Sequence, residues 1–180
     1  MSGNVKFGGN YAPTIEAQID ASRRGCSQAL FIYDDENKWV TEAGTMNIFF
    51  LWKKKDGKLE LVTPTLDDTC ILPGITRLSV IELAKEWGEF EVSERLISFD
   101  EIMEATEDGR LLESFGTGTA AVIQPFNGFQ YKGVLYECPV PKDDCSLAQR
   151  YLNILTGIQT GKVSHKWSEC IYLAKGTGSP

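Results

Sequence analysis

The 180-residue sequence predicts a mixed α/β domain, in which β-hairpins build a sheet and helices pack against it. Residues 47–52 and 59–63 are apolar runs that flank Asp56-Gly57, a strong signal for a tight hairpin turn. Residues 75–87 and 146–160 each carry an apolar stripe at helical spacing. Because the length suits one domain with a substantial core, we expect these hairpins and helices to share a single fold.

The first expected element is a helix that begins near Pro13 and ends before Gly25, with Ile15 and Ile19 on one face. Proline fits the first turn of a helix, and glycine is common just after the last turn. The remaining elements, in chain order, are strands over 28–33 and 38–41, the hairpin 47–63, the helix 75–87, a strand over 90–97, a helix from a capping box at Ser98 and Glu101 to about Glu107, strands over 111–115 and 120–126, a hairpin over 129–136 and the helix 146–160.

The composition limits the possible partners. A net charge of -7, with no basic run longer than residues 53–55, argues against a nucleic-acid-binding surface. No apolar run approaches the roughly 18 residues that span a membrane, and the first residues resemble neither a signal nor a transit peptide. We therefore expect a soluble intracellular protein. Five cysteines at irregular spacing and a single histidine, His165, predict buried reduced thiols and no metal site.

The segment from Lys6 to Tyr11 places a lysine beside Gly8 and Gly9, at the start of the first helix. A lysine amine can bind the aldehyde of pyridoxal phosphate covalently. The glycines would let the backbone approach a flat ring, and the tyrosine hydroxyl can hydrogen-bond a phenolate oxygen. A lysine near a chain end is more often a solvated charge, so this segment alone leaves both interpretations open.

Three further segments carry groups that suit the same cofactor. Glu42 precedes a glycine turn that opens a strand, and a carboxylate buried there would keep a pyridine nitrogen protonated; a surface glutamate is an equal alternative. Ile75 and Thr76 lie in the first turn of a helix, where free N–H groups favour a phosphate, although every helix has such an end. Residues 116–119 are expected to form a loop that, with Ala120, fits a phosphate and a small carboxylate, although a plain Gly/Thr loop is commoner.

Several motifs stand at the spacing of one family signature. They are Lys6-Phe7-Gly8-Gly9-Asn10-Tyr11, Glu42, Gly44, Thr45-Met46-Asn47-Ile48-Phe49, Leu61, Thr63, Leu72-Pro73-Gly74-Ile75-Thr76-Arg77, Trp87-Gly88-Glu89-Phe90 and Phe115-Gly116-Thr117-Gly118-Thr119-Ala120. In this combination the chain resembles the C-terminal half of branched-chain-amino-acid aminotransferases, which belong to the class IV pyridoxal-phosphate family. The resemblance extends over about residues 5–160 and favours the eukaryotic type.

The resemblance implies the C-terminal domain of fold type IV, similar to that of D-amino-acid aminotransferase, with a hairpin-rich pseudo-barrel sheet and packed helices. Residues 1–162 would form this cofactor-binding domain and residues 163–180 a tail, and the N-terminal domain of the family would be absent. The resemblance also implies a homodimer in the cytoplasm or the mitochondrion. Its ligands would be small molecules, namely branched-chain amino acids and 2-oxo acids, with no nucleic acid or membrane partner.

The resemblance assigns a role to each candidate residue. Lys6 would form the Schiff base with pyridoxal 5'-phosphate and carry the catalytic proton. Tyr11 would hydrogen-bond the phenolate oxygen, and Glu42 would pair with the pyridine nitrogen. The phosphate would be bound by the backbone amides of Ile75 and Thr76 and by the hydroxyl of Thr119. The groups facing the substrate would be Tyr11, Thr45, Thr119 and Ala120.

Two departures from the family pattern leave alternatives open. Only residues 1–5 precede Lys6, so an arginine and aromatic groups that the family's N-terminal domain supplies are not in this chain. Residues 121–124 read Ala-Val-Ile-Gln where mammalian members carry a redox-sensing C-x-x-C, so no thiol switch is expected there. The alternatives are a catalytically inactive cofactor-binding or dimerising remnant, and another class IV reaction, such as that of a D-amino-acid aminotransferase or an aminodeoxychorismate lyase.

Overall fold

A computed structural model of the chain describes residues 3–67, 70–142, 146–169 and 171. Its central strand is β3 (Met46–Lys53), in which every residue from Met46 to Trp52 is buried. Side chains alternate along a strand, and here both faces are apolar: Phe50 and Trp52 face one core, while Phe49 and Leu51 face another. A continuous apolar run of this kind predicts a strand that is covered on both faces.

Within the described residues the main sheet has seven strands, and β3 is the branch point. The other six are β1 (Leu30–Tyr33), β2 (Trp39–Ala43), β4 (Leu59–Pro64), β5 (Glu91–Arg95), β6 (Leu111–Gly118) and β7 (Val122–Pro125). β6 pairs along one edge of β3, while β2 pairs with the start and β4 with the end of the opposite edge. β5 runs parallel to β4, and the other pairs are antiparallel. The predicted hairpin-rich mixed sheet is confirmed.

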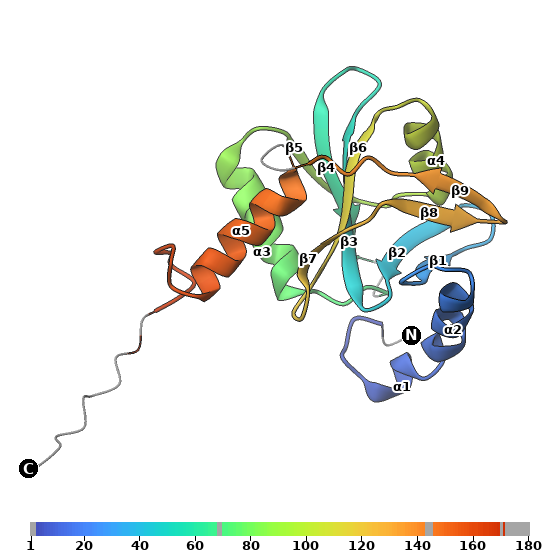
Figure 1. Cartoon of the computed structure of the whole chain (residues 1–180), viewed down its shortest axis with the longest axis horizontal. Helices are drawn as coiled ribbons and strands as arrows, with labels where there is room; N and C mark the ends of the chain where they lie inside the picture. Colours follow the sequence, from blue (N-terminus) through green and yellow to red (C-terminus); the bar gives the residue numbers. More distant parts are fainter. Residues whose placement is uncertain (1–2, 68–69, 143–145, 170, 172–180) are drawn as a thin grey trace, which may run out of the picture.

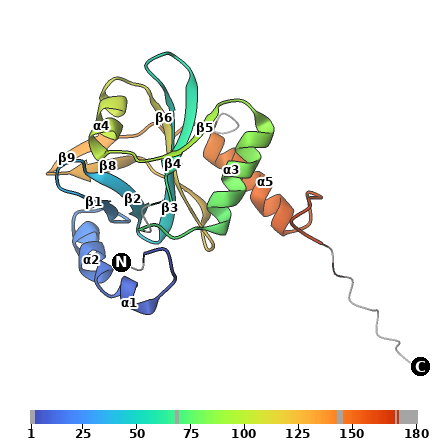
Figure 2. The ribbon, with the colours of Figure 1, turned by 180° about the vertical axis from the view of Figure 1, so that it is seen from behind.

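Helices and a second hairpin cover the two faces of this sheet (Figures 1 and 2). α3 (Ile75–Trp87) and α5 (Leu147–Gln159) pack on the face that carries Phe49. α4 (Phe99–Glu107) and the hairpin of β8 (Gly128–Tyr131) and β9 (Val134–Glu137) pack on the face that carries Phe50. The described residues therefore form a sheet between two apolar layers.

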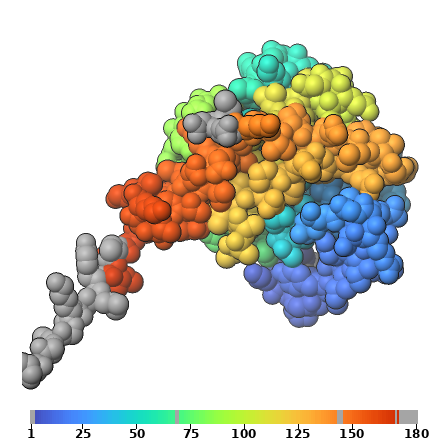
Figure 3. Space-filling model, in the orientation of Figure 1, coloured from blue at the N-terminus to red at the C-terminus, as the bar shows by residue number. Residues whose placement is uncertain are grey.

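The N-terminal helices are attached differently. α1 (Gly8–Tyr11) and α2 (Thr14–Arg23) contain no buried residue, and Ile15 and Ile19 are 59% and 47% exposed. The predicted helix after Pro13 is confirmed, but its apolar face does not enter either core. Figure 3 shows this segment as a blue lobe at the margin of the molecule.

The predicted loop at residues 116–119 is wrong for most of its length. Residues 116–118 belong to β6, where Thr117 pairs with Asn47 of β3. Gly116 is needed there because a Cβ would lie 2.8 Å from the Phe126 ring and 3.0 Å from Met46 Sδ. Gly116 thus permits close packing inside a sheet, which composition alone does not distinguish from a loop.

Two local predictions concern helix ends. The Ser98 hydroxyl accepts a hydrogen bond from the Glu101 N–H at the start of α4, whereas the Glu101 carboxylate contacts Arg95, so the N-cap half of the predicted capping box is confirmed. α3 ends at Gly88, which has the left-handed φ of 64°. None of the helices in the described ranges is long and apolar enough to cross a membrane.

The cysteine prediction is correct only in part. Cys138 is buried, but Cys26 and Cys70 are half-buried, and all three are free thiols. Cys145 and Cys170 lie outside the described residues, as does most of the predicted tail. At the start of that tail, the Val163 N–H donates to the Gly157 carbonyl oxygen, so residue 163 is hydrogen-bonded to the last turn of α5.

Candidate active site

A polar cluster joins the β2–β3 hairpin to the loop before α3. The Glu42 Oε1 atom accepts hydrogen bonds from Asn47 Nδ2 at 3.1 Å and from the Leu72 N–H at 3.3 Å. Asn47 Nδ2 also donates to the Leu72 carbonyl oxygen at 2.9 Å. The carboxyl, the side-chain amide and the peptide group of residue 72 therefore form a closed triangle.

Backbone pairing determines where this triangle lies. Glu42 and Asn47 are direct partners across the β2–β3 hairpin, and Asn47 pairs with Thr117 on its other side. Gly44 has a φ of 59° and allows the tight turn between the two strands. Asn47 is 5% exposed, so its side chain is fixed by the sheet as well as by its hydrogen bonds.

The environment of Glu42 disfavours its charged form. Burial raises the pKa of this half-buried carboxyl to about 7, and the Leu72 N–H opposes that shift by stabilising the anion. A carboxyl in such a site gains most from a cationic partner, because a positive charge would offset the lost hydration. Glu42 is thus suited to a ligand that presents a protonated nitrogen.

The first turn of α3 lies directly after this cluster. Its N-cap residue, Gly74, has no side chain to accept from the first N–H groups of the helix. Ile75 is 79% exposed and Thr76 is half-buried. Arg77 in the same turn is buried and contacts the Pro64 carbonyl oxygen and Glu94, both at 2.9 Å. The uncapped N–H groups and the helix dipole suit an anion such as a phosphate.

Two hairpin tips carry the candidate groups for a substrate. A Cβ on Gly118 would lie 3.8 Å from the Thr45 carbonyl oxygen, so the β2–β3 tip contacts the end of β6. Thr119 and Ala120, both exposed, form the turn into β7 just beyond Gly118. The structure thus brings Thr45 near to the 119–120 turn, which are distant in the sequence.

Lys6 and Tyr11 are placed less firmly. Lys6 is exposed in the loop before α1, and Tyr11 is 37% exposed at the end of α1. Gly3 packs tightly on the backbone of Cys70, since an added Cβ would lie 2.5 Å from the Cys70 carbonyl oxygen. The N-terminal segment therefore passes beside the loop that leads to Leu72. No hydrogen bond among the described residues links Lys6 or the Tyr11 hydroxyl to the Glu42 cluster.

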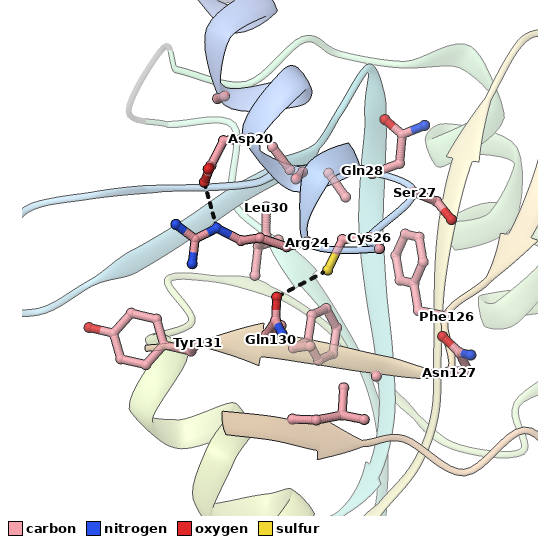
Figure 4. Close-up of a pocket in the computed structure, with 18 of the residues that line it drawn as sticks. Asp20, Arg24, Cys26, Ser27, Gln28, Leu30, Phe126, Asn127, Gln130 and Tyr131 are labelled. Atoms are coloured by element: carbon pink, nitrogen blue, oxygen red, sulfur yellow. Dashed lines mark hydrogen bonds and ion pairs between the residues drawn. The ribbon is translucent and has the colours of Figure 1, made fainter. Parts of the chain in front are cut away.

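A large groove lies elsewhere, between α2 and the β8–β9 hairpin. It has a volume of about 1110 Å³ and is lined by Arg24, Cys26, Gln130 and Tyr131 among others (Figure 4). Inside it, the Cys26 thiol donates to Gln130 Oε1 at 3.6 Å. None of the eight predicted site residues lines this groove. The predicted site residues are therefore not part of this groove, although Ala43, Met46 and Ala121, each next in sequence to one of them, line it.

Sequence reasoning did not recognise Asn47 as a partner of Glu42. A signal was present, because Asn47 is a single polar residue in the otherwise apolar run from Met46 to Trp52. A buried amide inside such a strand must find partners, which here are the Glu42 carboxyl and the Leu72 carbonyl group. The Thr117 hydroxyl, beside Asn47 in the sheet, is buried and has no hydrogen-bond partner among the described residues.

Comparison with known proteins identifies the relatives of this arrangement. Residues 5–126 match the family model for class IV amino-transferases. The chain is 45% identical over 167 residues to the cytosolic branched-chain-amino-acid aminotransferase of Mus musculus, and the match covers 93% of this chain and 43% of that protein. It is 46% identical over 165 residues to the mitochondrial branched-chain-amino-acid aminotransferase of Bos taurus, and that match covers 92% of this chain and 42% of the bovine protein.

A solved structure shows the same fold. The branched-chain amino acid aminotransferase of Thermobaculum terrenum, in its PLP form, is 27% identical to the chain, with a TM-score of 0.70. The match covers 91% of this chain and 47% of the solved one. The chain thus spans less than half the length of each of these relatives.

Proposed function

The chain belongs to the class IV aminotransferase family, and from this premise we propose that it acts as a branched-chain amino acid aminotransferase. The reaction transfers the amino group of leucine, isoleucine or valine to 2-oxoglutarate with pyridoxal 5'-phosphate as cofactor. The observation that carries the proposal is the Glu42 carboxyl, with a pKa of about 7, beside the uncapped start of α3. The identity to the two curated branched-chain enzymes supports this substrate class.

The residues present fit the proposed cofactor. The cofactor has a basic ring nitrogen on one side and a phosphate on the other. The chain offers the Glu42 carboxyl for the nitrogen and the N-terminus of α3 for the phosphate, and the loop after Leu72 connects them. When bound, pyridoxal phosphate supplies an electron sink that stabilises the carbanion formed at the substrate α-carbon. The Glu42 carboxylate would hold a proton on the ring nitrogen and so strengthen that sink.

Other groups of the chain would bind the cofactor and orient it toward the substrate. The Lys6 amine would hold the cofactor covalently and then move the proton between the substrate α-carbon and the cofactor carbon. The Tyr11 hydroxyl would donate to the phenolate oxygen. The N–H groups of Ile75 and Thr76 and the Thr119 hydroxyl would donate to the phosphate.

Specificity would come from the two hairpin tips. Thr45 and the turn at Thr119 and Ala120, together with Tyr11, would face the substrate. The closeness of the Thr45 loop to the end of β6 supports this assignment. We also propose a homodimer, which sedimentation of the purified chain would test.

One observation favours a second candidate function, a cofactor-binding chain without turnover. Lys6 and Tyr11 lie on a segment whose helices contain no buried residue, whereas catalysis needs groups held in fixed geometry. Borohydride reduction after incubation with pyridoxal phosphate separates the candidates. An adduct on Lys6 without turnover supports this second function, and absence of an adduct contradicts both.

The direct test is an assay of the purified chain with pyridoxal phosphate, leucine and 2-oxoglutarate. The proposal predicts glutamate in proportion to the leucine consumed. D-Alanine in place of leucine is the matched control for another class IV reaction. No glutamate from a chain with an intact circular dichroism spectrum would reject the proposed activity.

A further inference from the structure

The triangle of Glu42, Asn47 and Leu72 connects the two ends of the proposed cofactor site. Glu42 would serve the ring nitrogen, and the loop from Leu72 to Gly74 leads into the α3 turn that would serve the phosphate. Asn47 Nδ2 donates to Glu42 at 3.1 Å and to the Leu72 carbonyl oxygen at 2.9 Å. One buried amide therefore contacts both ends.

Gly74 shows that the contact with the loop is tight. A Cβ at residue 74 would lie 2.2 Å from Asn47 Oδ1, which is far inside van der Waals contact. Asn47 cannot easily turn away, because it is 5% exposed and its amide already makes two hydrogen bonds. The absence of a side chain at Gly74 and the orientation of Asn47 are thus mutually required.

The backbone of Asn47 is fixed as well. It pairs with Glu42 on one side and with Thr117 on the other, at the centre of the main sheet. A side chain on such a strand has little freedom to shift. Through this side chain, and beside the direct hydrogen bond from the Leu72 N–H to Glu42, the sheet can therefore set the distance between the Glu42 carboxyl and the start of α3.

We propose that Asn47 is a positioning residue that fixes the spacing between the carboxyl for the cofactor ring and the helix N-terminus for the phosphate. The inference rests on the proposed function for the identity of the ligand. The proposed ligand is a rigid ring, so its two contacts form together only at the correct spacing. In this proposal Asn47 does not contact the cofactor itself; it acts through Glu42 and the 72–74 loop.

The first experiment uses the full chain without cofactor. Asn47→Ala should raise the pKa of Glu42 further, because the carboxylate loses a donor, and this is measured by NMR of ¹³C-labelled glutamate. Amide exchange over residues 70–76 should accelerate about tenfold, since the loop loses its contact to the sheet. Asn37→Ala is the matched control, because its amide also donates to a carboxylate, Asp34, but at an exposed turn.

The second experiment measures pyridoxal phosphate affinity by fluorescence titration. Asn47→Ala and Gly74→Ala should each weaken binding about tenfold. In the double variant Gly74→Ala should add little, because the obstructing amide is gone. If Asn47→Ala does not fold, Gly74→Ala must still shift the Glu42 titration, since its Cβ would displace the Asn47 amide.

The outcomes are separable. An unchanged Glu42 titration and unchanged exchange in Asn47→Ala would overturn the positioning role, whatever the chain binds. Additive losses in the double variant would show that residues 47 and 74 do not act through one contact, and would overturn it too. If the unaltered chain binds no pyridoxal phosphate, the proposed function fails, and so does the role of Asn47 toward this cofactor. The cofactor-free measurements then still decide whether Asn47 positions Glu42 and the 72–74 loop.

Discussion

The two halves of the candidate site are held in different ways. The Glu42 half lies on strands whose side chains are buried on both faces, and two hydrogen bonds link it to Leu72 in the loop before α3. The Lys6 half lies before two helices without a buried residue. The comparison teaches that the groups proposed for the ring and the phosphate are pre-organised next to the sheet, whereas the proposed reactive amine is carried by a segment that contributes little to the core.

Removing the proposed reactive amine should have the largest functional effect and almost no structural one. Lys6→Ala should abolish the covalent cofactor and all turnover, because the Schiff base is assigned to this amine. Thermal stability should stay within about 0.5 kcal/mol, since Lys6 is exposed. Mass spectrometry after borohydride reduction and thermal denaturation measure the two effects. Lys132→Ala, on the exposed β8–β9 turn, is the control, and residual turnover in Lys6→Ala would contradict the assignment.

Truncating a core side chain should have the largest effect on stability. Phe50 is fully buried in β3, where its ring stacks with Trp52 and lies tilted against Phe129. Phe50→Ala should lower the free energy of unfolding by about 3–5 kcal/mol, as is usual for a buried phenylalanine. Denaturant titration measures the loss. A loss below about 1 kcal/mol would mean that β3 is not the centre of the fold.

Glu42 should make the stability of the cofactor-free chain depend on pH. Its folded pKa of about 7 exceeds the ordinary value of 4.5, so the folded chain binds more protons between these values. Stability from this group is therefore complete below pH 4.5 and is lost as pH rises through 7, on the order of 2 kcal/mol after allowance for partial exposure.

Glu42→Gln should flatten this dependence, because the amide cannot ionise. Denaturant titrations of both chains between pH 4 and pH 8 give the difference directly, and the other carboxyls cancel in it. If both chains lose the same stability across that interval, Glu42 is not the titrating group.

The smallest effect is expected in α2. Ile15 is 59% exposed, so Ile15→Ala should change the free energy of unfolding by less than about 0.5 kcal/mol. Denaturant titration beside Phe50→Ala sharpens the contrast between the two halves. A loss near 2 kcal/mol would show that α2 packs more firmly in solution than its exposure indicates.

Much of the fold could be predicted because local signals agreed with the final packing. Asp56-Gly57 marks the β3–β4 turn, and Ser98 caps α4. The failure at residues 116–118 has a physical cause, since a glycine that allows close packing in a sheet looks the same as one that allows a turn. The exposure of Ile15 and Ile19 could not be predicted from the sequence, because a periodic apolar face does not show what the helix packs against.

The candidate site was predictable as a set of residues but not as an arrangement. The signature spacing indicated Glu42, Ile75 and Thr76, and the structure places them around one loop. The Asn47 bridge needs the register of β2 against β3 and the path of residues 70–74, which no local pattern contains.

A crystal structure of the full chain with pyridoxal phosphate tests the central claim most directly. The account predicts the ring nitrogen within hydrogen-bonding distance of the Glu42 carboxyl, the phosphate at the N–H groups of Ile75 and Thr76, and electron density joining the ring to Lys6. Binding of the cofactor in the groove between α2 and the β8–β9 hairpin, with the Glu42 cluster vacant, would contradict it.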